Sequence, residues 1–156
     1  MAFRQLLGEY ECKLDAKGRM RLPTGLINQL GEGQSHTLVI NRGFEKCLVL
    51  YPEDVWKKIS GEIDALNIYN KKNRDFARYF YRGAQELTMD SADRILLPKR
   101  LMEYAGIEND VILSAYNGRI EVWSKDEYDR MMEDEPIDFS DLANDVLGKL
   151  GQNPEE

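Results

Sequence analysis

The residues best equipped for chemistry are two arginines, Arg19 and Arg94, which stand in matching surroundings 75 residues apart. Each lies four residues after an aspartate and four residues before a proline, so that 15–23 and 90–98 both read D-x-x-x-R-x-x-x-P. A guanidinium group offers five donors in a rigid fork, which suits phosphate oxygens or the O6 and N7 atoms of guanine. An arginine presented on a turn therefore indicates binding to an anion or to nucleic acid.

The similarity extends beyond the two motifs. Residues 8–31 and 83–106 are identical at eight of 24 aligned positions, whereas unrelated segments of average composition would share roughly one or two. A match of this length indicates a duplicated unit, and such a duplication determines the architecture. We therefore predict one protein built from two similar halves.

An aspartate four residues before an arginine also has a purely structural interpretation, in which the two side chains pair and close the turn. For one isolated copy, the structural interpretation is favoured. Two copies in a pseudo-symmetric chain favour a functional one, because a symmetric pair of exposed arginines matches the two-fold symmetry of a DNA duplex.

The two loops differ in charge. In the first, three cations face one aspartate, which gives a net charge of +2. In the second, alanine, aspartate and leucine replace Lys17, Gly18 and Arg21, and the net charge is negative. We expect the first loop to be the main DNA contact and the second to be auxiliary. The predicted DNA-binding residues are Lys17, Arg19, Arg21 and Arg94, and the loop-shaping residues are Asp15, Gly18 and Asp90.

The surrounding pattern predicts the elements that position these loops. Each half should run strand, turn, short strand and helix, followed by a hairpin and a second helix. Glycines at 31 and 106 end the first helix of each half, and Asn117-Gly118 is a strong hairpin signal. Ser124, with Glu127 three residues later, is a capping box that starts the final helix. The predicted strands are 9–14, 20–23, 37–41 and 47–51 in the first half and 86–89, 95–98, 111–113 and 120–123 in the second.

A basic and aromatic helix is predicted over 71–82, between the two halves. Arg74, Arg78 and Arg82 recur at every fourth residue and form one stripe beside apolar side chains. Such a charged row is usually a solvated helix face. The functional alternatives are an auxiliary phosphate contact and a subunit interface.

The net charge of −7 is unevenly distributed. Residues 125–156 hold 11 acids and 3 bases, a net −8, whereas residues 1–124 hold 17 acids and 18 bases, a net +1. The acidity thus belongs to the C-terminal end, and the body can carry a basic face that binds nucleic acid. The chain has no apolar run of the roughly 20 residues that a membrane span needs.

Motifs for catalysis are missing from the sequence. There is no nucleophile elbow, Walker loop, dinucleotide-binding fingerprint or metal-ligand cluster. Cys12, Cys47 and the single histidine, His36, follow no metal-ligand spacing. The cysteines fit a reduced, cytoplasmic compartment, with a single disulfide as the open alternative. We predict that the chain is not an enzyme and has no cofactor, metal, membrane or small-molecule partner.

The two D-x-x-x-R motifs stand beside five further characteristic stretches, 8–11, 47–52, 83–86, 104–106 and 120–123. With these residues the sequence resembles the MraZ family of bacterial transcriptional regulators over about residues 1–132. The resemblance implies a mixed α/β fold, mainly β, in which two pseudo-symmetric AbrB-like swapped-hairpin repeats form one β-barrel-like domain with flanking helices. The expected units are a first repeat (1–70), a connecting helix (71–82), a second repeat (83–132) and an acidic tail (133–156).

The resemblance also implies a function. Members of this family form ring-shaped homo-oligomers that bind short tandem repeats of double-stranded DNA in their own promoter. By position, Arg19 and Arg94 match the DNA-contacting arginines, while Asp93 departs from the glycine usual before the second one. We therefore expect a nucleoid-associated regulator, a repressor, of the division and cell-wall gene cluster. The alternative is an antitoxin-like module whose acidic C-terminal segment masks a basic surface on a partner protein.

Overall fold

The computed structural model describes residues 6–31, 37–134 and 138–150. These residues form antiparallel sheets and a set of helices, which confirms the predicted mixed α/β fold. Helices hold more of the chain than strands do, so the expectation of a mainly β protein was wrong. In chain order the elements are β1 (Gly8–Lys13), β2 (Arg19–Arg21), α1 (Thr24–Leu30), β3 (Thr37–Arg42), β4 (Leu48–Pro52), α2 (Glu53–Asp64), α3 (Lys71–Tyr81), β5 (Gln85–Thr88), β6 (Arg94–Leu96), α4 (Lys99–Ala105), β7 (Asp110–Tyr116), β8 (Arg119–Ser124), α5 (Lys125–Glu133) and α6 (Phe139–Leu150).

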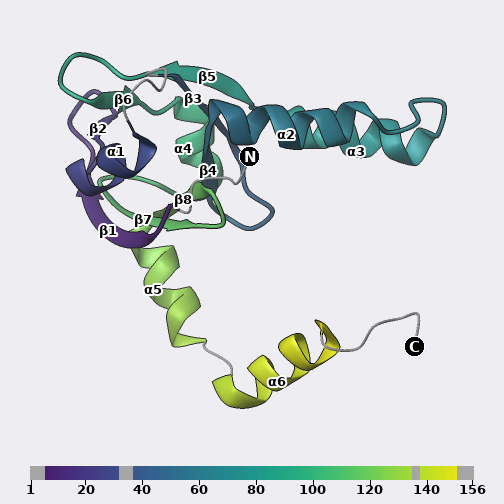
Figure 1. Cartoon of the computed structure of the whole chain (residues 1–156). Helices are drawn as coiled ribbons and strands as arrows, with labels where there is room; N and C mark the ends of the chain where they lie inside the picture. Colours follow the sequence, from purple (N-terminus) through teal and green to yellow (C-terminus); the bar gives the residue numbers. More distant parts are fainter. Residues whose placement is uncertain (1–5, 32–36, 135–137, 151–156) are drawn as a thin grey trace.

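The two repeats exchange strands. Six strands form one sheet in the order β1-β7-β8-β4-β3-β5, and β2 pairs with β6 in a separate ribbon (Figure 1). Strand β1 of the first repeat pairs with β7 of the second, and β5 of the second pairs with β3 of the first. The first strand of each repeat thus adds to the two-stranded hairpin of the other repeat, which is the predicted swapped arrangement.

The predicted barrel-like closure is not found. Strands β1 and β5 lie at opposite edges of the six-stranded sheet, and within the described ranges no pairing joins them. The ribbon of β2 and β6 is a separate sheet, and a single bridge between Leu14 and Met20 links it to the chain directly after β1. The two repeats thus share an open sheet with a separate ribbon instead of one closed barrel.

A pseudo-two-fold axis relates the repeats. Met20 pairs with Ile95 at the centre of the ribbon, and these residues are equivalent in the two copies of the duplicated unit. Strands β4 and β8, which are also equivalent, pair with each other in the middle of the large sheet. Both central pairings therefore join equivalent elements, and neither can form within one repeat alone.

The core lies between these layers and takes side chains from both repeats. Its residues come from the ribbon, the inward face of the large sheet and helices α1 and α4. Two smaller clusters lie beneath α2 and α5, around the aromatic pairs Tyr51–Trp56 and Trp123–Tyr128. The largest fully buried side chains include Met20, Leu22, Leu26, Ile40, Leu50, Ile95, Leu113 and Ile120.

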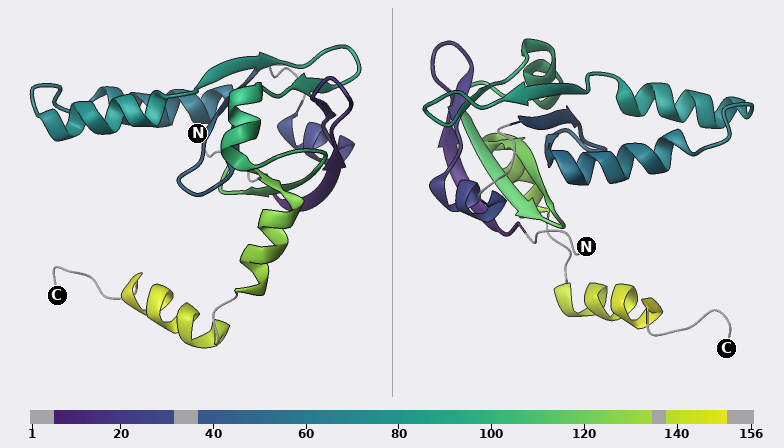
Figure 2. Two further views of the ribbon diagram at one scale, coloured as in Figure 1. Left: turned by 180° about the vertical axis from the view of Figure 1, so that it is seen from behind. Right: turned by 45° about the horizontal axis from the view of Figure 1, so that its top comes forward.

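Helices α2 and α3 form a hairpin that extends away from the sheet (Figures 1 and 2). Trp56 stacks on Phe80 with 5.8 Å between the ring centroids. The Tyr81 hydroxyl donates to the carboxylate of Asp64 at 2.7 Å. Helix α3, which the sequence suggested as a connection between repeats, thus packs on α2 of the first repeat.

Helices α5 and α6 follow the second repeat. The Ser124 hydroxyl accepts a hydrogen bond from the backbone N–H of Glu127 at 3.3 Å, in agreement with the predicted helix start. Figure 2 shows α6 apart from the sheet in both views. In the part of the chain that the structure describes, no helix is long and apolar enough to cross a membrane.

The ribbon provides a matched pair for testing the core. The Ile95 side chain is 1% exposed, whereas its neighbour Leu96 is 55% exposed. We expect Ile95→Ala to lower the free energy of unfolding by about 2–5 kcal/mol, because it removes buried methyl groups at the pseudo-two-fold axis. Leu96→Ala should change it by less than about 0.5 kcal/mol. Urea unfolding at one fixed protein concentration measures both, and equal effects would contradict the assignment of the buried face.

Candidate nucleic-acid interface

The two D-x-x-x-R turns have the same internal hydrogen bonds. In the first, Oδ1 of Asp15 accepts from the backbone N–H groups of Lys17 and Arg19, and Oδ2 accepts from Nε of Arg19 at 2.8 Å. In the second, Oδ2 of Asp90 accepts from Nε of Arg94 at 2.9 Å, and Oδ1 repeats the backbone contacts. The aspartates therefore close the turns and fix the guanidinium groups, which stay about one-third exposed.

A residue in the left-handed conformation precedes each arginine. Gly18 has φ 82° and Asp93 has φ 60°. Glycine adopts this region freely, and aspartate enters it more readily than most other residues do. The aspartate at the glycine position therefore does not alter the second turn, whose hydrogen bonds match those of the first.

Both aspartates have a pKa below the ordinary value. The largest cause is the hydrogen bond from the backbone N–H of Arg19 to Asp15, and of Arg94 to Asp90. The side-chain bond and the positive charge of each arginine act in the same direction. These bonds stabilise the charged carboxylate. The turns are therefore built around ionised aspartates.

The β2–β6 ribbon joins the two turns. Its central pair is buried, so the flanking side chains point outward. Arg19 lies opposite Leu96, and Arg21 lies opposite Arg94. Like charges directly opposite each other destabilise strand pairing. Asp90 already pairs with Arg94, so the uncompensated charge on this outward face is that of Arg21, and it favours an anionic ligand.

Each turn also accepts a backbone hydrogen bond from the residue that follows the ribbon strand of the other repeat. The backbone N–H of Leu22 donates to the carbonyl of Asp93 at 2.9 Å, and that of Leu97 donates to the carbonyl of Gly18 at 3.0 Å. The two left-handed residues thus present their carbonyl groups across the ribbon. The turns form one rigid unit, and a change in one affects the other.

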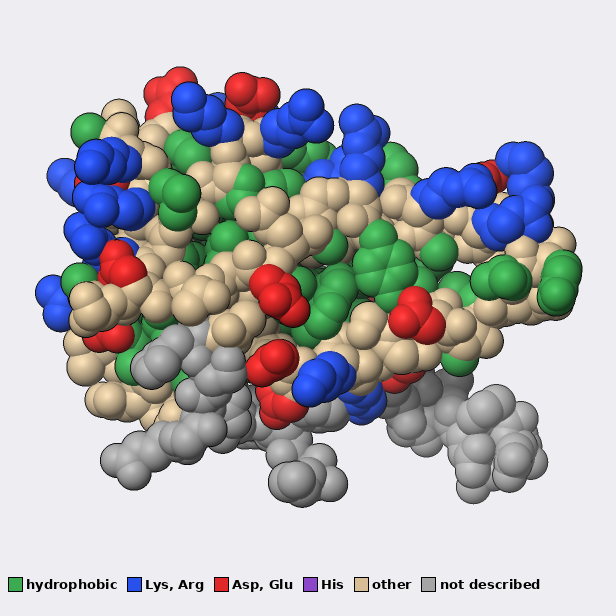
Figure 3. Space-filling model, turned by 90° about the horizontal axis from the view of Figure 1, so that it is seen from above, with side chains coloured by type: hydrophobic (Ala, Val, Ile, Leu, Met, Phe, Trp, Pro, Cys, Tyr) green, Lys and Arg blue, Asp and Glu red, His purple; other side chains and the backbone are tan. Residues whose placement is uncertain are grey.

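The structure brings the predicted DNA-binding residues together at one end of the molecule. Figure 3 shows Lys and Arg side chains gathered at its left end, where Figure 1 places β2 and β6. Lys17 and Arg21 are exposed, and no described residue forms an ion pair or hydrogen bond with either side chain. Arg21 belongs to the first loop in sequence but lies opposite Arg94. Each arginine of the motif therefore has another cation nearby.

Sequence reasoning missed Lys99. This residue begins α4, is exposed, and lines the same shallow groove as Lys17 and Gly18. Its signal in the sequence was its place directly after the proline of the second motif. Lys99 brings a positive charge from the second repeat to the first turn.

The arginines of α3 are not at this interface. Nη1 of Arg74 donates to the carbonyl of Ile68 at 2.8 Å and so fixes the connection between α2 and α3. Arg78 lies 3.8 Å from Asp75, and Arg82 is exposed beyond the end of the helix. In Figures 1 and 2, α3 extends away from β2 and β6. The structure therefore separates this stripe from the ribbon.

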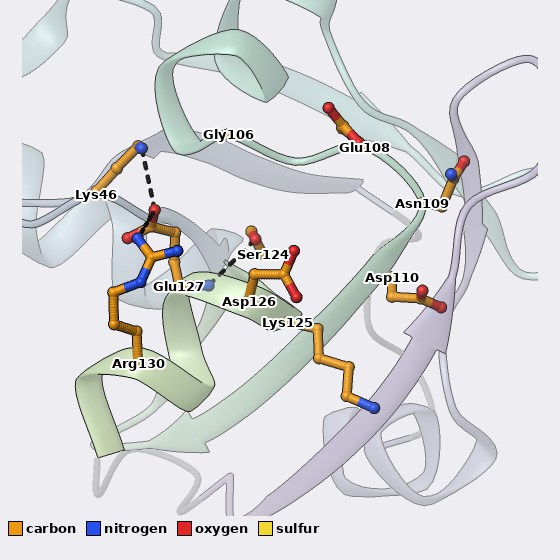
Figure 4. Close-up of a pocket in the computed structure, with 10 residues that line it drawn as sticks. All are labelled: Lys46, Gly106, Glu108, Asn109, Asp110, Ser124, Lys125, Asp126, Glu127 and Arg130. Carbon is orange, nitrogen blue, oxygen red and sulfur yellow. Dashed lines mark hydrogen bonds and ion pairs between the residues drawn. The ribbon is translucent and has the colours of Figure 1, made fainter. Parts of the chain in front are cut away.

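A second cleft lies beside the start of α5 (Figure 4). Its charges are largely paired within the chain: Glu127 accepts from Lys46 at 3.2 Å and from Arg130 at 2.9 Å, and Lys125 contacts Glu11 at 2.9 Å. Within the described ranges, no group of three or more His, Cys, Asp or Glu residues is placed to hold a metal ion. The cleft thus offers an anion less unpaired charge than the ribbon does.

The two cysteines are free thiols. Burial raises the pKa of Cys47 to about 12, and burial also raises the pKa of the half-buried Cys12. Both thiols are therefore protonated at neutral pH, and neither is a good nucleophile. The single histidine, His36, lies outside the described residues.

The fold and the ribbon together define a class: a two-repeat protein whose halves exchange strands and join their D-x-x-x-R turns in one arginine-bearing ribbon. A comparison with protein families gives the particular family. Its model, described as "MraZ protein, putative antitoxin-like", matches residues 5–79 and again residues 80–149. The chain belongs to the MraZ family.

Curated relatives match over nearly the whole chain, and each is named Transcriptional regulator MraZ. The protein from Christiangramia forsetii is 42% identical over 144 residues, which cover 92% of this chain and 93% of the relative. The protein from Flavobacterium psychrophilum is 38% identical over 149 residues, which are 95% of each chain. The protein from Bifidobacterium longum is 39% identical over 145 residues, covering 93% and 94%.

These matches correct the expected extent of the resemblance. The second match to the family model reaches residue 149 and so includes nearly all of α6. The sequence resemblance had been expected to end near residue 132. The acidic helix is therefore part of the second family unit, just as α3 is largely within the first.

The hydrogen bonds of the turns predict a pH dependence. Because the folded-state pKa of Asp15 is lowered, the stability that this group contributes is present above its ordinary pKa of about 3.9 and is lost as the pH falls through the lower folded-state value. In Arg19→Ala the backbone N–H remains, so we expect Asp15 to titrate still below about 3.9. A carbon-13 NMR titration of the carboxyl groups measures this, with Asp75 on α3, whose pKa is also lowered, as the internal control away from the ribbon. An ordinary pKa for Asp15 in the variant would show that the guanidinium group, and not the backbone, holds the carboxylate.

Proposed function

We propose that the chain is a sequence-specific DNA-binding transcriptional regulator that contacts duplex DNA with the outward face of the β2–β6 ribbon. One observation carries this proposal: Arg21 and Arg94 are opposed on an exposed ribbon, and the side chain of Arg21 has no described partner. A DNA phosphate would neutralise the charge of Arg21. A two-stranded ribbon also fits the major groove.

The residues divide into two roles. Arg19 and Arg94 are held at Nε by aspartates, so their orientation is fixed before binding. A guanidinium group fixed in this way suits bidentate contact with guanine, which specifies sequence. Lys17, Arg21 and Lys99 have no such restraint, and they supply contacts to phosphate, which position the protein but do not read bases.

Membership of the family supports a proposal for the target. Relatives of this chain are named as transcriptional regulators, and the MraZ resemblance implies tandem repeats in the protein's own promoter, upstream of the division and cell-wall genes. We propose that the chain represses that cluster, associates with the nucleoid and acts as a homo-oligomeric ring. One ribbon offers few cations, so a single copy should bind weakly. Several ribbons on repeated DNA elements gain affinity through effective concentration.

An antitoxin-like module remains the second candidate function. The observation that favours it is α6, whose described apolar side chains are exposed and whose charge is mainly acidic. A mobility-shift titration on the gene's own upstream DNA separates the two candidates. Tight, saturable binding supports the regulator, and absence of binding supports the module.

The opposed arginines give the sharpest test of the DNA contact. We expect Arg21→Ala to weaken binding to the upstream DNA by about 1–3 kcal/mol, roughly 5-fold to 150-fold, because it removes an exposed cation from the ribbon. The slope of log affinity against log salt concentration should fall by about one. Lys57→Ala is the matched control, since Lys57 is an exposed cation on α2, away from the ribbon. An equal loss in both variants would contradict the proposed surface.

The cross-strand arrangement further predicts that both motif arginines matter. Arg94 has Arg21 opposite it, and Arg19 has Lys17 in the same turn. We therefore expect Arg94→Ala to weaken DNA binding about as much as Arg19→Ala, within roughly a factor of three. Fluorescence anisotropy with labelled upstream DNA measures both variants under one salt condition. A loss confined to Arg19→Ala would show that the first loop acts alone.

A further inference from the structure

The second repeat ends in two helices that correspond to the helical hairpin of the first. Helix α2 begins after residue 52 and α5 begins after residue 124, 72 positions later. At the same spacing, Tyr51 corresponds to Trp123 and Trp56 to Tyr128, and each aromatic pair packs beneath its helix. Helix α6 follows α5 as α3 follows α2. In sequence, therefore, α6 is the counterpart of α3.

The two counterparts differ in packing. Helix α3 lies against α2, where Phe80 stacks on Trp56. Helix α6 has an apolar stripe at helical spacing that stays exposed, from 42% at Leu142 to 77% at Phe139. The side chains of such a stripe stay hydrated, and contribute little hydrophobic stabilisation, unless another surface covers them. The members of the stripe are Phe139, Leu142, Val146 and Leu147.

Helix α3 carries a second exposed stripe on the side that does not face α2. Lys72, Phe76 and Tyr79 follow each other at intervals of four and three residues and so share one helix face. Phe76 is 43% exposed and Tyr79 is 65% exposed. At the adjoining tip of the hairpin, Ile68 and Tyr69 are exposed as well. The Arg42 guanidinium lies 4.5 Å from the centroid of the Tyr79 ring and leaves the rest of that side chain exposed. This stripe is thus an apolar surface with cations in it.

The charges of the two helices are complementary. Residues 71–82 contain five cations and one acid. Residues 138–149 contain three acids and one cation. At 100° per residue, Asp145 lies along one edge of the α6 stripe, while Lys72 lies within the α3 stripe. Placing one stripe on the other would therefore pair opposite charges beside the apolar contact.

We propose that α6 of one copy docks along the Lys72–Phe76–Tyr79 stripe of α3 in a second copy. The second copy is favoured over the same chain because α5 carries α6 away from α3 in every view of Figures 1 and 2. Each copy then gives one helix and accepts one, which is a heterologous contact. Such a contact closes only in a ring, or continues as a filament. The inference deepens the proposed homo-oligomer and rests on that part of the proposed function, but it does not rest on DNA binding.

Complementary full-length variants test the direction of the contact. Leu142→Glu/Val146→Glu disables the donor helix, and Phe76→Glu/Tyr79→Glu disables the acceptor. Light scattering without DNA should show that the unaltered protein assembles and that each variant alone has the mass of one chain. Mixed together, they should form a 1:1 dimer and nothing larger, because only one donor and one acceptor remain intact. Asn144→Glu, on the opposite side of α6, is the matched control and should assemble normally.

Other outcomes overturn the proposal. Assembly of either double variant alone would indicate a contact between two identical surfaces, such as α6 with α6 or α3 with α3. Unaltered protein with the mass of a single chain would indicate that α6 folds back on its own copy or stays uncovered. Circular dichroism confirms that each variant is folded. A charge exchange gives a second measurement: Lys72→Glu and Asp145→Lys should each weaken assembly at least tenfold, and the two together should restore it. Failure of restoration would also overturn the proposal, whereas DNA binding is measured separately.

Discussion

The exchange of first strands between the repeats is the constraint on which the rest of the structure depends. Strand β1 finds its partner in β7, and β5 finds its partner in β3, so neither repeat can satisfy its own backbone groups alone. The exchange also brings Met20 next to Ile95 and thereby joins β2 to β6. The ribbon is therefore a product of the whole fold. Either repeat expressed without the other would keep its D-x-x-x-R turn but would lack the partner strand of the ribbon, which stabilises that turn.

Duplication explains why the ribbon carries opposed charges. In a symmetric two-fold pairing, the residue after the central position of one strand faces the residue before the central position of the other. Arg21 therefore faces Arg94, and the corresponding pair is Arg19 with Leu96. With arginine at 96, the ribbon would hold four arginines on one face. Leucine there removes one unfavourable pair and leaves the other, so the two ends of the ribbon differ chemically although their turns have the same shape.

Local patterns predicted most of the elements, because alternation, helical spacing and turn residues act over short distances. The capping residue Ser124 and the turn at Asn117-Gly118 were predicted from such signals and lie in those roles. The open sheet and the packing of α3 on α2 were not predicted, since both depend on contacts between distant residues. The position of Arg21 opposite Arg94 is a further example. The positive charge of Arg21 was evident from the sequence, but which residue lies opposite it depends on the register between β2 and β6, which belong to different repeats.

The difference between the two ends of the ribbon bears on how an assembly would meet DNA. If every copy gives α6 to the next and accepts one from the previous copy, all copies in the assembly have the same direction. Each ribbon then presents its Arg19 end and its Arg21–Arg94 end in the same order. DNA elements repeated in one direction match such a series. With inverted elements, every second ribbon would meet its DNA element in the reversed orientation. A head-to-tail contact gives the copies one direction and an asymmetric ribbon makes that direction matter, so the two together would lead to a preference for tandem sites over palindromes.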